Sequence, residues 1–205
     1  CSFLVTPVVD ATRAFGKLAP GSGRSLTGPL GRPFPADVDD PVCVAGGVGL
    51  APFLLLARAH AAAGRRLRLL FGGRNRAALA GIDDLAPLAD VHASTDDGSH
   101  GFRGMVTGLL EHLLDRGEVA PGATVFCCGP DPMMHAVAAL CERRGLRCFL
   151  SLETYMACGY GVCNGCTVEV RGPRFAGWPY SRTCIEGPVY EACELAAFAD
   201  PVPHG

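Results

Sequence analysis

Pro41-Val-Cys-Val-Ala-Gly-Gly-Val-Gly-Leu-Ala-Pro52 is the stretch of sequence that decides the fold. It opens on a short apolar run, typical of a buried strand, and continues into a glycine-rich turn. The apolar segment 50–63 follows and predicts a helix that ends at Gly64. We therefore expect the first strand and the first helix of a parallel α/β sheet here.

The same alternation of strand and helix continues for about a hundred residues. Further strands are expected at 66–71, 91–94, 124–127 and 147–152, and further helices at 77–89, 105–115 and 132–144. Alternating strands and helices predict a doubly wound α/β fold with a parallel five-stranded sheet. We assign this domain to residues 41–153.

The glycine-rich junction has the features of a nucleotide site. Its pattern G-x-G-x-x-P includes Gly47, which allows a tight turn, and Gly49, which lets a phosphate or nicotinamide approach the backbone. Pro52 falls in the first helical turn, where a missing N–H costs little. The helix N-terminus favours a pyrophosphate. An ordinary turn is the alternative, but the place of the motif in the domain favours a nucleotide.

Three more segments follow strands at the edge where ligands of parallel sheets bind: 72–75, 95–99 and 128–133. Each by itself is compatible with an ordinary turn, but together they form one rim. Candidate cofactor contacts on this rim and in the first turn are Gly46, Arg74, Asp96, Asp97, Cys128, Gly129 and Pro130. Arg74 and Arg76, with no acid at the end of the second strand, would by charge suit NADP.

Four cysteines near the C-terminal end form a second motif. Cys158, Cys163 and Cys166 have the spacing C-x4-C-x2-C, and Cys184 follows the short strand expected at 167–170. This spacing is typical of a plant-type [2Fe–2S] cluster. The four cysteines are therefore candidate metal ligands, with Cys193 as an alternative to Cys184.

The glycines of this motif support the cluster. Gly159, Gly161 and Gly165 alternate with the cysteines, and glycine permits tight turns and close approach of backbone N–H groups to sulfur. A structural zinc site is the alternative. Zinc sites usually pair two C-x2-C knuckles, whereas this chain has one.

Composition limits the classes of function. The chain has 205 residues, of which 49% are hydrophobic, and a net charge of −2. The charge and the lack of a basic run argue against nucleic acid as a partner. No apolar stretch is long enough to span a membrane. Eleven cysteines in α/β-type sequence fit a reducing cytoplasm. No general acid or base stands out, so we name no catalytic residue.

Residues 1–40 have a different pattern. A strand-like segment at 2–9, a turn cluster at 26–31 and a linker at 33–40 indicate the end of a β-rich unit. The chain begins with Cys1 rather than methionine, and we expect a further N-terminal piece.

Several segments together resemble a known family. They are Gly28-Pro-Leu-Gly31, the Gly46–Pro52 turn, Thr95-Asp-Asp-Gly-Ser99, Cys128-Gly-Pro130, the Ser151–Cys166 stretch and Cys184-Ile-Glu-Gly-Pro-Val-Tyr190. In this order they resemble the ferredoxin-NADP reductase superfamily, and within it most closely the electron-transfer subunits of NAD-dependent dihydroorotate dehydrogenase. Glu186 stands where the family more often has Asp.

The resemblance implies three domains. Residues 1–40 would be the truncated C-terminal part of an FAD-binding β-barrel, 41–153 an NAD-binding domain, and 154–205 a small [2Fe–2S] domain. Thr12 matches a position that faces the FAD phosphates, and Gly28 begins the segment that closes the barrel. The family suggests NAD rather than NADP.

The resemblance also implies a partner. This would be an FMN-containing dihydroorotate dehydrogenase catalytic subunit in a heterotetramer, with electrons passing from FMN through the cluster and FAD to NAD⁺ in pyrimidine biosynthesis. Two alternatives remain. One is a reductase subunit of a hydrogenase or of a ferredoxin-dependent transhydrogenase. The other is a zinc-stabilised nucleotide-binding module without catalysis.

Overall fold

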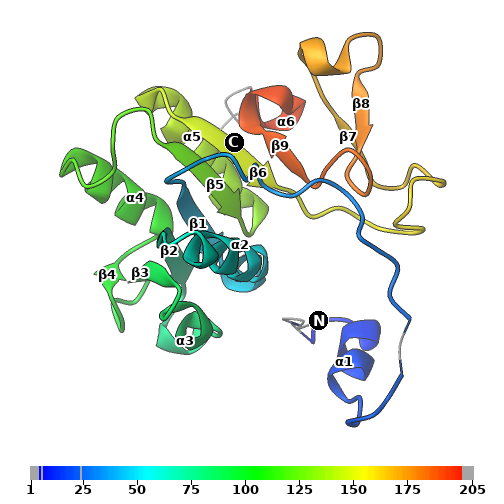
Figure 1. The fold of residues 1–205 in the computed structure, drawn as a ribbon, viewed down its shortest axis with the longest axis horizontal. Coiled ribbons are helices and arrows are strands. Elements are labelled where there is room, and N and C mark those ends of the chain that lie inside the picture. The colour runs from blue at the N-terminus through cyan, green and yellow to red at the C-terminus, as the bar shows by residue number, and fades with distance from the viewer. Residues whose placement is uncertain (1–4, 6, 24, 200–205) are drawn as a thin grey trace.

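The computed structural model describes residues 5, 7–23 and 25–199. Figure 1 shows a sheet covered by helices, a smaller hairpin region beside it, and an N-terminal arm that carries one helix. The main sheet has the strand order β4-β3-β2-β1-β5-β6-β9. Its strands are β1 (Val42–Gly46), β2 (Leu67–Gly73), β3 (Ala89–Thr95), β4 (Phe102–Arg103), β5 (Thr124–Cys128), β6 (Arg147–Ser151) and β9 (Val189–Glu191).

The five predicted strands are confirmed, and all of them pair in parallel. The described sheet is nevertheless larger than predicted. β4 adds a two-residue parallel strand beside β3, and β9 pairs antiparallel with β6 at the opposite edge. β4 is too short to show a hydrophobic period. β9 comes from the cysteine-bearing segment, which follows the domain boundary expected at residue 153. The main sheet therefore contains strands from both sides of that boundary.

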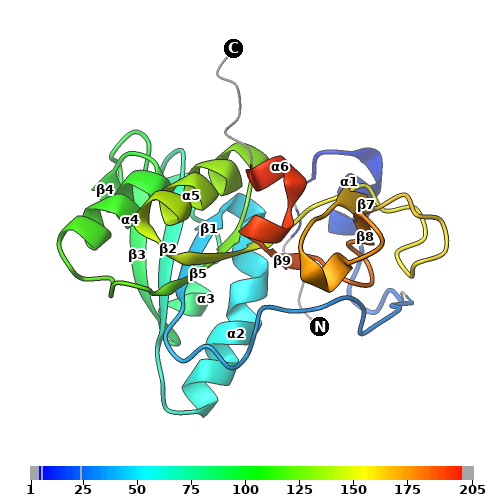
Figure 2. The same cartoon turned by 90° about the horizontal axis from the view of Figure 1, so that it is seen from above.

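Helices cover both faces of the sheet (Figure 2), as the doubly wound pattern predicts. α4 (Val106–Asp115) and α5 (Asp131–Arg144) pack on one face, and α2 (Ala51–Ala62) and α3 (Ile82–Leu85) pack on the other. All five residues of β1 are buried, because alternate side chains enter the two cores. A strand that is covered on both faces has a continuous run of apolar residues, and this run is the feature of the sequence that predicted β1.

The prediction of one helix over residues 77–89 is wrong, because the helical part of this segment is shorter and interrupted. A 3₁₀ turn at Arg76–Ala78 comes first, and α3 is a single turn at Ile82–Leu85. Gly81 separates the two with φ +86°, a conformation outside the right-handed helical region.

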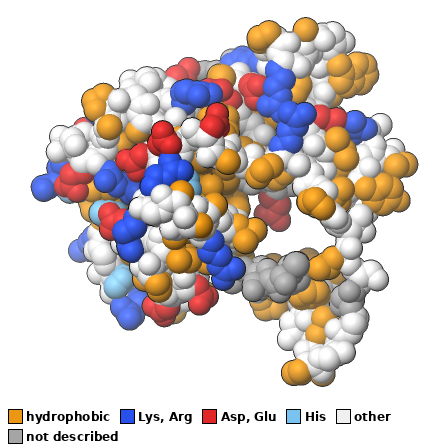
Figure 3. Space-filling model, viewed as in Figure 1, with side chains coloured by type: hydrophobic (Ala, Val, Ile, Leu, Met, Phe, Trp, Pro, Cys, Tyr) orange, Lys and Arg blue, Asp and Glu red, His pale blue; other side chains and the backbone are white. Residues whose placement is uncertain are grey.

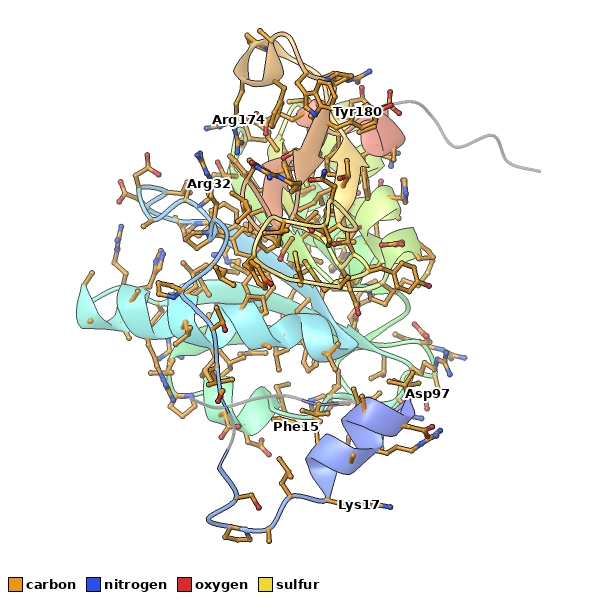
Figure 4. The ribbon with its side chains drawn as sticks, turned by 90° about the vertical axis from the view of Figure 1, so that its right-hand side faces the viewer. Phe15, Lys17, Arg32, Asp97, Arg174 and Tyr180 are labelled. Atoms are coloured by element: carbon orange, nitrogen blue, oxygen red, sulfur yellow. The ribbon has the colours of Figure 1, made fainter. Side chains whose placement is uncertain are left out.

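The N-terminal arm differs from the expected barrel strands. Its described residues up to position 40 include helix α1 (Asp10–Gly16) and no strand. Residues 2–4 and 6 of the expected strand lie outside the described part, and Val9 serves as the N-cap of α1. A strand needs a neighbour to accept its hydrogen bonds, and the described residues offer this segment none. Figure 4 shows α1, with Phe15 and Lys17, at the opposite end of the molecule from Arg174 and Tyr180.

The expected linker at 33–40 is anchored to the domain. The Phe34 ring is buried between Phe53 and Phe126, with centroid distances of 5.4 and 4.8 Å. The backbone N–H of Arg32 donates to the carbonyl of Gly187. The arm thus enters the body beside the strand that ends the main sheet.

The cysteine-bearing region is built on a two-stranded hairpin. β7 (Thr167–Glu169) pairs antiparallel with β8 (Tyr180–Arg182). Tyr190 on β9 is fully buried, and its hydroxyl lies 2.9 Å from the buried Ser181 hydroxyl on β8. This hydrogen bond joins the hairpin to the main sheet. A one-turn helix, α6 (Ala196–Ala199), follows β9 and a 3₁₀ turn.

We predict that Tyr190→Phe lowers the free energy of unfolding by about 1–2 kcal/mol, because it leaves the buried Ser181 hydroxyl without its partner. Urea unfolding measures the change. Tyr155→Phe is the control, because Tyr155 is 95% exposed, and it should leave the free energy unchanged. Equal stability of the two variants would contradict the assigned role of the Tyr190–Ser181 bond.

Candidate nucleotide and iron–sulfur sites

A cavity of about 660 Å³ lies at the carboxyl edge of the main sheet. It is bordered by the turn after β1, the end of β2, the end of β3 and the first turns of α4 and α5. The residues that line it include Gly46, Gly47, Gly72, Gly73, Arg74, Asp96, Thr107, Pro130, Pro132 and Met133. Two helix N-termini therefore face one cavity, an arrangement that favours an anionic ligand.

Two positions at the cavity floor require glycine, because neighbouring side chains leave no space for a Cβ atom. A Cβ on Gly46 would lie 2.6 Å from the Met133 sulfur, and one on Gly72 would lie 2.7 Å from Val106 Cβ. Gly47 has φ +56°, which confirms the tight turn predicted there. These glycines leave bare backbone where a dinucleotide would pass closest to the sheet.

Gly49 has a packing role that the motif did not predict. It is buried and is not among the lining residues of the cavity. A Cβ at this position would lie 2.1 Å from the carbonyl oxygen of Cys128 and 2.7 Å from the Gly129 nitrogen. Gly49 thus lets the turn after β1 pack directly on the turn after β5. Pro52 lies in the first turn of α2, as predicted.

The structure places some of the charged rim residues at the cavity and others outside it. Arg74 and Asp96 line the cavity. Arg76 lies outside it, with Nη1 3.0 Å from His100 Nδ1 and its backbone N–H donating to Ser99 Oγ at 2.9 Å. Hydrogen bonds from Ser99 lower the pKa of Asp97, so this carboxylate is held by its own loop.

Sequence reasoning missed residues that only the packing reveals. Thr107 and Met133 line the cavity from the first turns of α4 and α5. Ser94 is fully buried, and its hydroxyl has no hydrogen-bond partner among the described residues. Its oxygen would lie 3.4 Å from a Cβ on Gly72, directly below the cavity floor. An orphaned polar atom in this position fits a site that accepts a polar ligand.

Two predicted cofactor residues lie away from this cavity. Thr12 is on α1, where its hydroxyl accepts hydrogen bonds from the N–H groups of Val8 and Val9. Gly28 lies in the extended arm and is exposed. The structure does not bring either one together with the dinucleotide residues.

Two of the four cysteines in the C-terminal motif have their sulfurs in contact, and the other two are joined by a hydrogen bond from backbone to sulfur. The sulfurs of Cys166 and Cys184 are 3.3 Å apart. The Cys158 sulfur accepts a hydrogen bond from the N–H of Cys163 at 3.5 Å and another from Val162 at 3.4 Å. Within the described ranges, no three His, Cys, Asp or Glu residues are close enough to hold a single metal ion.

Backbone N–H groups make this loop receptive to a cationic metal group. The N–H groups of Cys163 and Tyr160 lower the pKa of the Cys158 thiol to about 6. Burial opposes ionisation of Cys166, but hydrogen bonds from Cys184, Thr183 and its own backbone together lower the Cys166 pKa. Burial and the Cys166 thiol raise the pKa of Cys184. Thiolates are the form that binds iron, so the donor set fits the predicted cluster.

The loop is seated on the turn that contains Cys184. Gly161 has φ +89°, and a Cβ on it would lie 2.7 Å from the Ile185 side chain. The N–H of Thr183 donates to the Cys166 carbonyl at 3.1 Å, beside the register pair Thr167–Arg182 of the hairpin. The β7–β8 pairing therefore sets Cys166 next to Cys184.

The other cysteines occupy different environments. Cys193 is exposed on the 3₁₀ turn Ala192–Glu194, beyond β9. Cys43, Cys127 and Cys148 are buried, and burial contributes to raising the pKa of each thiol. They are core side chains. Among the described helices, none has the length and apolar character required to cross a lipid bilayer.

Two family models match the chain. Residues 43–139 match the oxidoreductase NAD-binding domain, and residues 153–196 match the iron-sulfur cluster binding domain of dihydroorotate dehydrogenase B. The first runs from β1 through β5 and includes the residues that line the 660 Å³ cavity, which we call the dinucleotide cavity, and the second includes the four cysteines. Fold and site thus define an oxidoreductase subunit with an NAD-binding domain and an iron–sulfur domain.

Similar whole sequences narrow this class to one family. The chain is 32% identical to the electron transfer subunit of dihydroorotate dehydrogenase B (NAD(+)) of Bacillus caldolyticus, over 95% of this chain and 74% of that protein. It is 37% identical to a probable subunit of the same kind from Methanothermobacter thermautotrophicus, over 87% of this chain and 63% of that protein. The chain belongs to the family of dihydroorotate dehydrogenase B electron transfer subunits.

Solved structures share the fold. One, described as the NADH-dependent reduced ferredoxin-NADP oxidoreductase in work on flavin-based electron bifurcation, has a TM-score of 0.77 and 26% identity, over 92% of this chain and 66% of that chain. Another, full-length CYP116B46 from Tepidiphilus thermophilus, has a TM-score of 0.52 and 19% identity, over 82% of this chain and 28% of that chain. The second likeness shows the fold alone.

We predict that Gly49→Ala lowers the free energy of unfolding by about 3 kcal/mol, because the added methyl group overlaps backbone atoms that cannot move aside. Urea unfolding gives the value. The control is Gly64→Ala, at a glycine with φ +72° and open space around it, which should lose about 1 kcal/mol from strain alone. Equal losses in both variants would refute the packing role of Gly49.

Proposed function

We propose that this subunit passes electrons from the FMN of a dihydroorotate dehydrogenase catalytic subunit to NAD⁺, with a [2Fe–2S] cluster and FAD as the carriers between them. The observation that carries the proposal is that the nucleotide site and the cysteine site lie in one folded chain. The dinucleotide cavity and the four-cysteine loop belong to one chain, and β9 ties the second to the sheet of the first.

The cofactors supply the redox chemistry. A [2Fe–2S] cluster transfers single electrons, NAD⁺ accepts a hydride, and a flavin exchanges electrons in both ways. Because the cluster gives up single electrons and NAD⁺ accepts two electrons as a hydride, a flavin is needed between them. This supports FAD as the group next to the nicotinamide. We assign Thr12 and Gly28 of the N-terminal arm to the FAD site, following the family resemblance.

The proposed cluster ligands are Cys158, Cys163, Cys166 and Cys184. The 3.3 Å distance between the Cys166 and Cys184 sulfurs supports a group with two irons, in which these two thiolates hold one iron and Cys158 and Cys163 hold the other. Exposure and distance support Cys184 over Cys193, since Cys184 is buried against Cys166 while Cys193 lies beyond β9.

The proposed dinucleotide contacts are the backbone of Gly46 and Gly47, the Arg74 guanidinium and the first turn of α5. Backbone N–H groups and a guanidinium both donate to pyrophosphate oxygens. Gly49, Cys128 and Gly129 act by holding the two turns in contact, and Pro130 lines the cavity.

Apolar side chains around the cysteine loop support docking of a partner protein. Tyr155, Met156, Tyr160 and Val162 are between 51% and 95% exposed. Figure 3 shows hydrophobic side chains gathered on this side of the molecule, over the cysteine loop and the β7–β8 hairpin. Exposed apolar side chains that cluster in this way are typical of interaction surfaces. We propose that the FMN subunit docks here, in a heterotetramer.

The structural likeness to a ferredoxin-NADP oxidoreductase supports a second candidate function. In that case the same cavity and cysteine loop would serve a ferredoxin-dependent transhydrogenase, and the partner would not oxidise dihydroorotate.

We predict that Cys184→Ser loses the visible absorption of the cluster and at least half of the iron, because a [2Fe–2S] cluster is held by four thiolates and this variant has three. Cys193→Ser is the matched control and should keep both. The measurement is absorption with iron and sulfide analysis after anaerobic purification. Cluster loss in Cys193→Ser together with retention in Cys184→Ser would reverse the ligand assignment.

The function is tested by co-expression with the FMN-containing catalytic subunit of the same organism. We predict that the purified complex reduces NAD⁺ with dihydroorotate, whereas the catalytic subunit alone does not. A complex with intact cluster and flavins that reduces NAD⁺ only with reduced ferredoxin would favour the second candidate. A colourless chain that contains zinc would refute both.

A further inference from the structure

One side chain bridges the two parts of the chain that carry the cysteine pairs. Arg182 ends β8, two residues before Cys184. Its Nη1 donates to the carbonyl oxygen of Gly161 at 2.8 Å, and Gly161 lies between Cys158 and Cys163. A single guanidinium therefore joins the loop that contains Cys158 and Cys163 to the turn that contains the buried Cys184.

A carboxylate holds this guanidinium in place. Glu186 Oε1 accepts from Arg182 Nη2 at 2.7 Å, and Glu186 Oε2 accepts from the Arg182 backbone N–H at 2.8 Å. Oε2 also lies 3.4 Å from Nε. The backbone N–H of Glu186 returns to the Arg182 carbonyl at 2.9 Å, so residues 182–186 form one closed turn. With both ends fixed, the guanidinium has little freedom to leave the Gly161 carbonyl.

The guanidinium also lies within electrostatic reach of the sulfurs. Arg182 lies two residues before Cys184, and its Nη1 is bound to Gly161, which lies two residues before Cys163 in the cysteine loop. The Arg182 side chain is 37% exposed, so solvent screens its charge only in part. A fixed positive charge beside a cluster favours the reduced state, which carries one more negative charge.

We propose that Arg182 is a positioning residue for the iron–sulfur cluster, which fastens the Cys158–Cys163 loop to the Cys184 turn and raises the reduction potential of the cluster through its charge. The inference rests on the proposed function, because it requires the cluster. The step concerned is the uptake of one electron from the flavin partner, and no bond in the protein forms or breaks.

The opposite charges of Arg182 and Glu186 make the proposal testable. Substitution of either residue loosens the same turn, so a purely mechanical effect would move the potential in the same direction in both variants. Loss of the positive charge lowers the potential, whereas loss of the negative charge raises it. A charge effect therefore has opposite signs in Arg182→Gln and Glu186→Gln.

Arg147→Gln is the matched control. Arg147 donates to both oxygens of Glu191 at 3.1 Å, at the edge of the main sheet. It forms a bidentate ion pair like that of Arg182, but it contacts no residue of the cysteine loop in the described hydrogen bonds. Arg147→Gln therefore shows what the loss of a surface ion pair does by itself, so that the effect of losing the Arg182–Glu186 pair can be measured against it.

The experiment is an anaerobic redox titration of each holo variant, followed by electron paramagnetic resonance of the reduced cluster. At an ambient potential equal to the wild-type midpoint, we expect Arg182→Gln to lower the ratio of reduced to oxidised cluster by about tenfold, or about 59 mV for one electron. Glu186→Gln should raise this ratio, and Arg147→Gln should leave it unchanged.

Arg182→Lys separates the two roles. Lysine keeps the charge but lacks the fork that binds Gly161 and Glu186 together. We expect a near wild-type potential with faster loss of iron to a chelator. If Arg182→Gln retains no cluster, the Lys and Glu186 variants decide the charge effect.

Two results would overturn the inference. One is a shift of the same sign in Arg182→Gln and Glu186→Gln, and the other is unchanged potential and iron retention in every variant. A wild-type chain without iron and sulfide would instead refute the proposed function, on which this inference depends.

Discussion

The backbone pairing of β9 with β6 is the interaction on which the organisation of this subunit depends. β9 lies at the edge of the parallel sheet and runs against its neighbour, with Phe149 opposite Glu191 and Ser151 opposite Val189. Between β6 and β9 the chain leaves the sheet, forms the cysteine loop and the hairpin, and returns. Because both ends of this excursion are fixed to adjacent strands, the cysteines are held at a defined place relative to the dinucleotide cavity.

Buried contacts reinforce this attachment from both sides. Tyr190 fills the core under β9 and bonds to Ser181 of the hairpin, while the arm contributes Phe34 to the opposite core. An electron-transfer protein benefits from such rigidity, since its carriers must keep their separation without help from bound substrate. The N-terminal helix α1 buries none of its residues and does not share in this framework.

The cysteines show how one residue type takes different roles according to its surroundings. Thiols inside the sheet have raised pKa values, to which burial contributes, and act as small apolar side chains. Cys158, in a loop whose N–H groups point at its sulfur, has a lowered pKa. The glycines divide in the same way. Gly47 supplies a positive φ, whereas Gly49 supplies only the absence of a side chain.

By itself the sequence determined the doubly wound parallel sheet, the tight turn at Gly47, the placement of Pro52 and the four-cysteine motif. These are local properties, since they follow from hydrophobic runs, turn residues and the spacing of ligands along one segment. The strand expected at 2–9 is absent from the described residues of that segment, because a strand exists only where another strand pairs with it. The tertiary structure alone decided that β9 completes the sheet, that Gly49 packs on Cys128, that Thr107 and Ser94 approach the cavity, and that Arg182 reaches Gly161. Each of these joins residues far apart in the chain, and such contacts are set by the packing of elements whose order along the sequence does not reveal their neighbours in space.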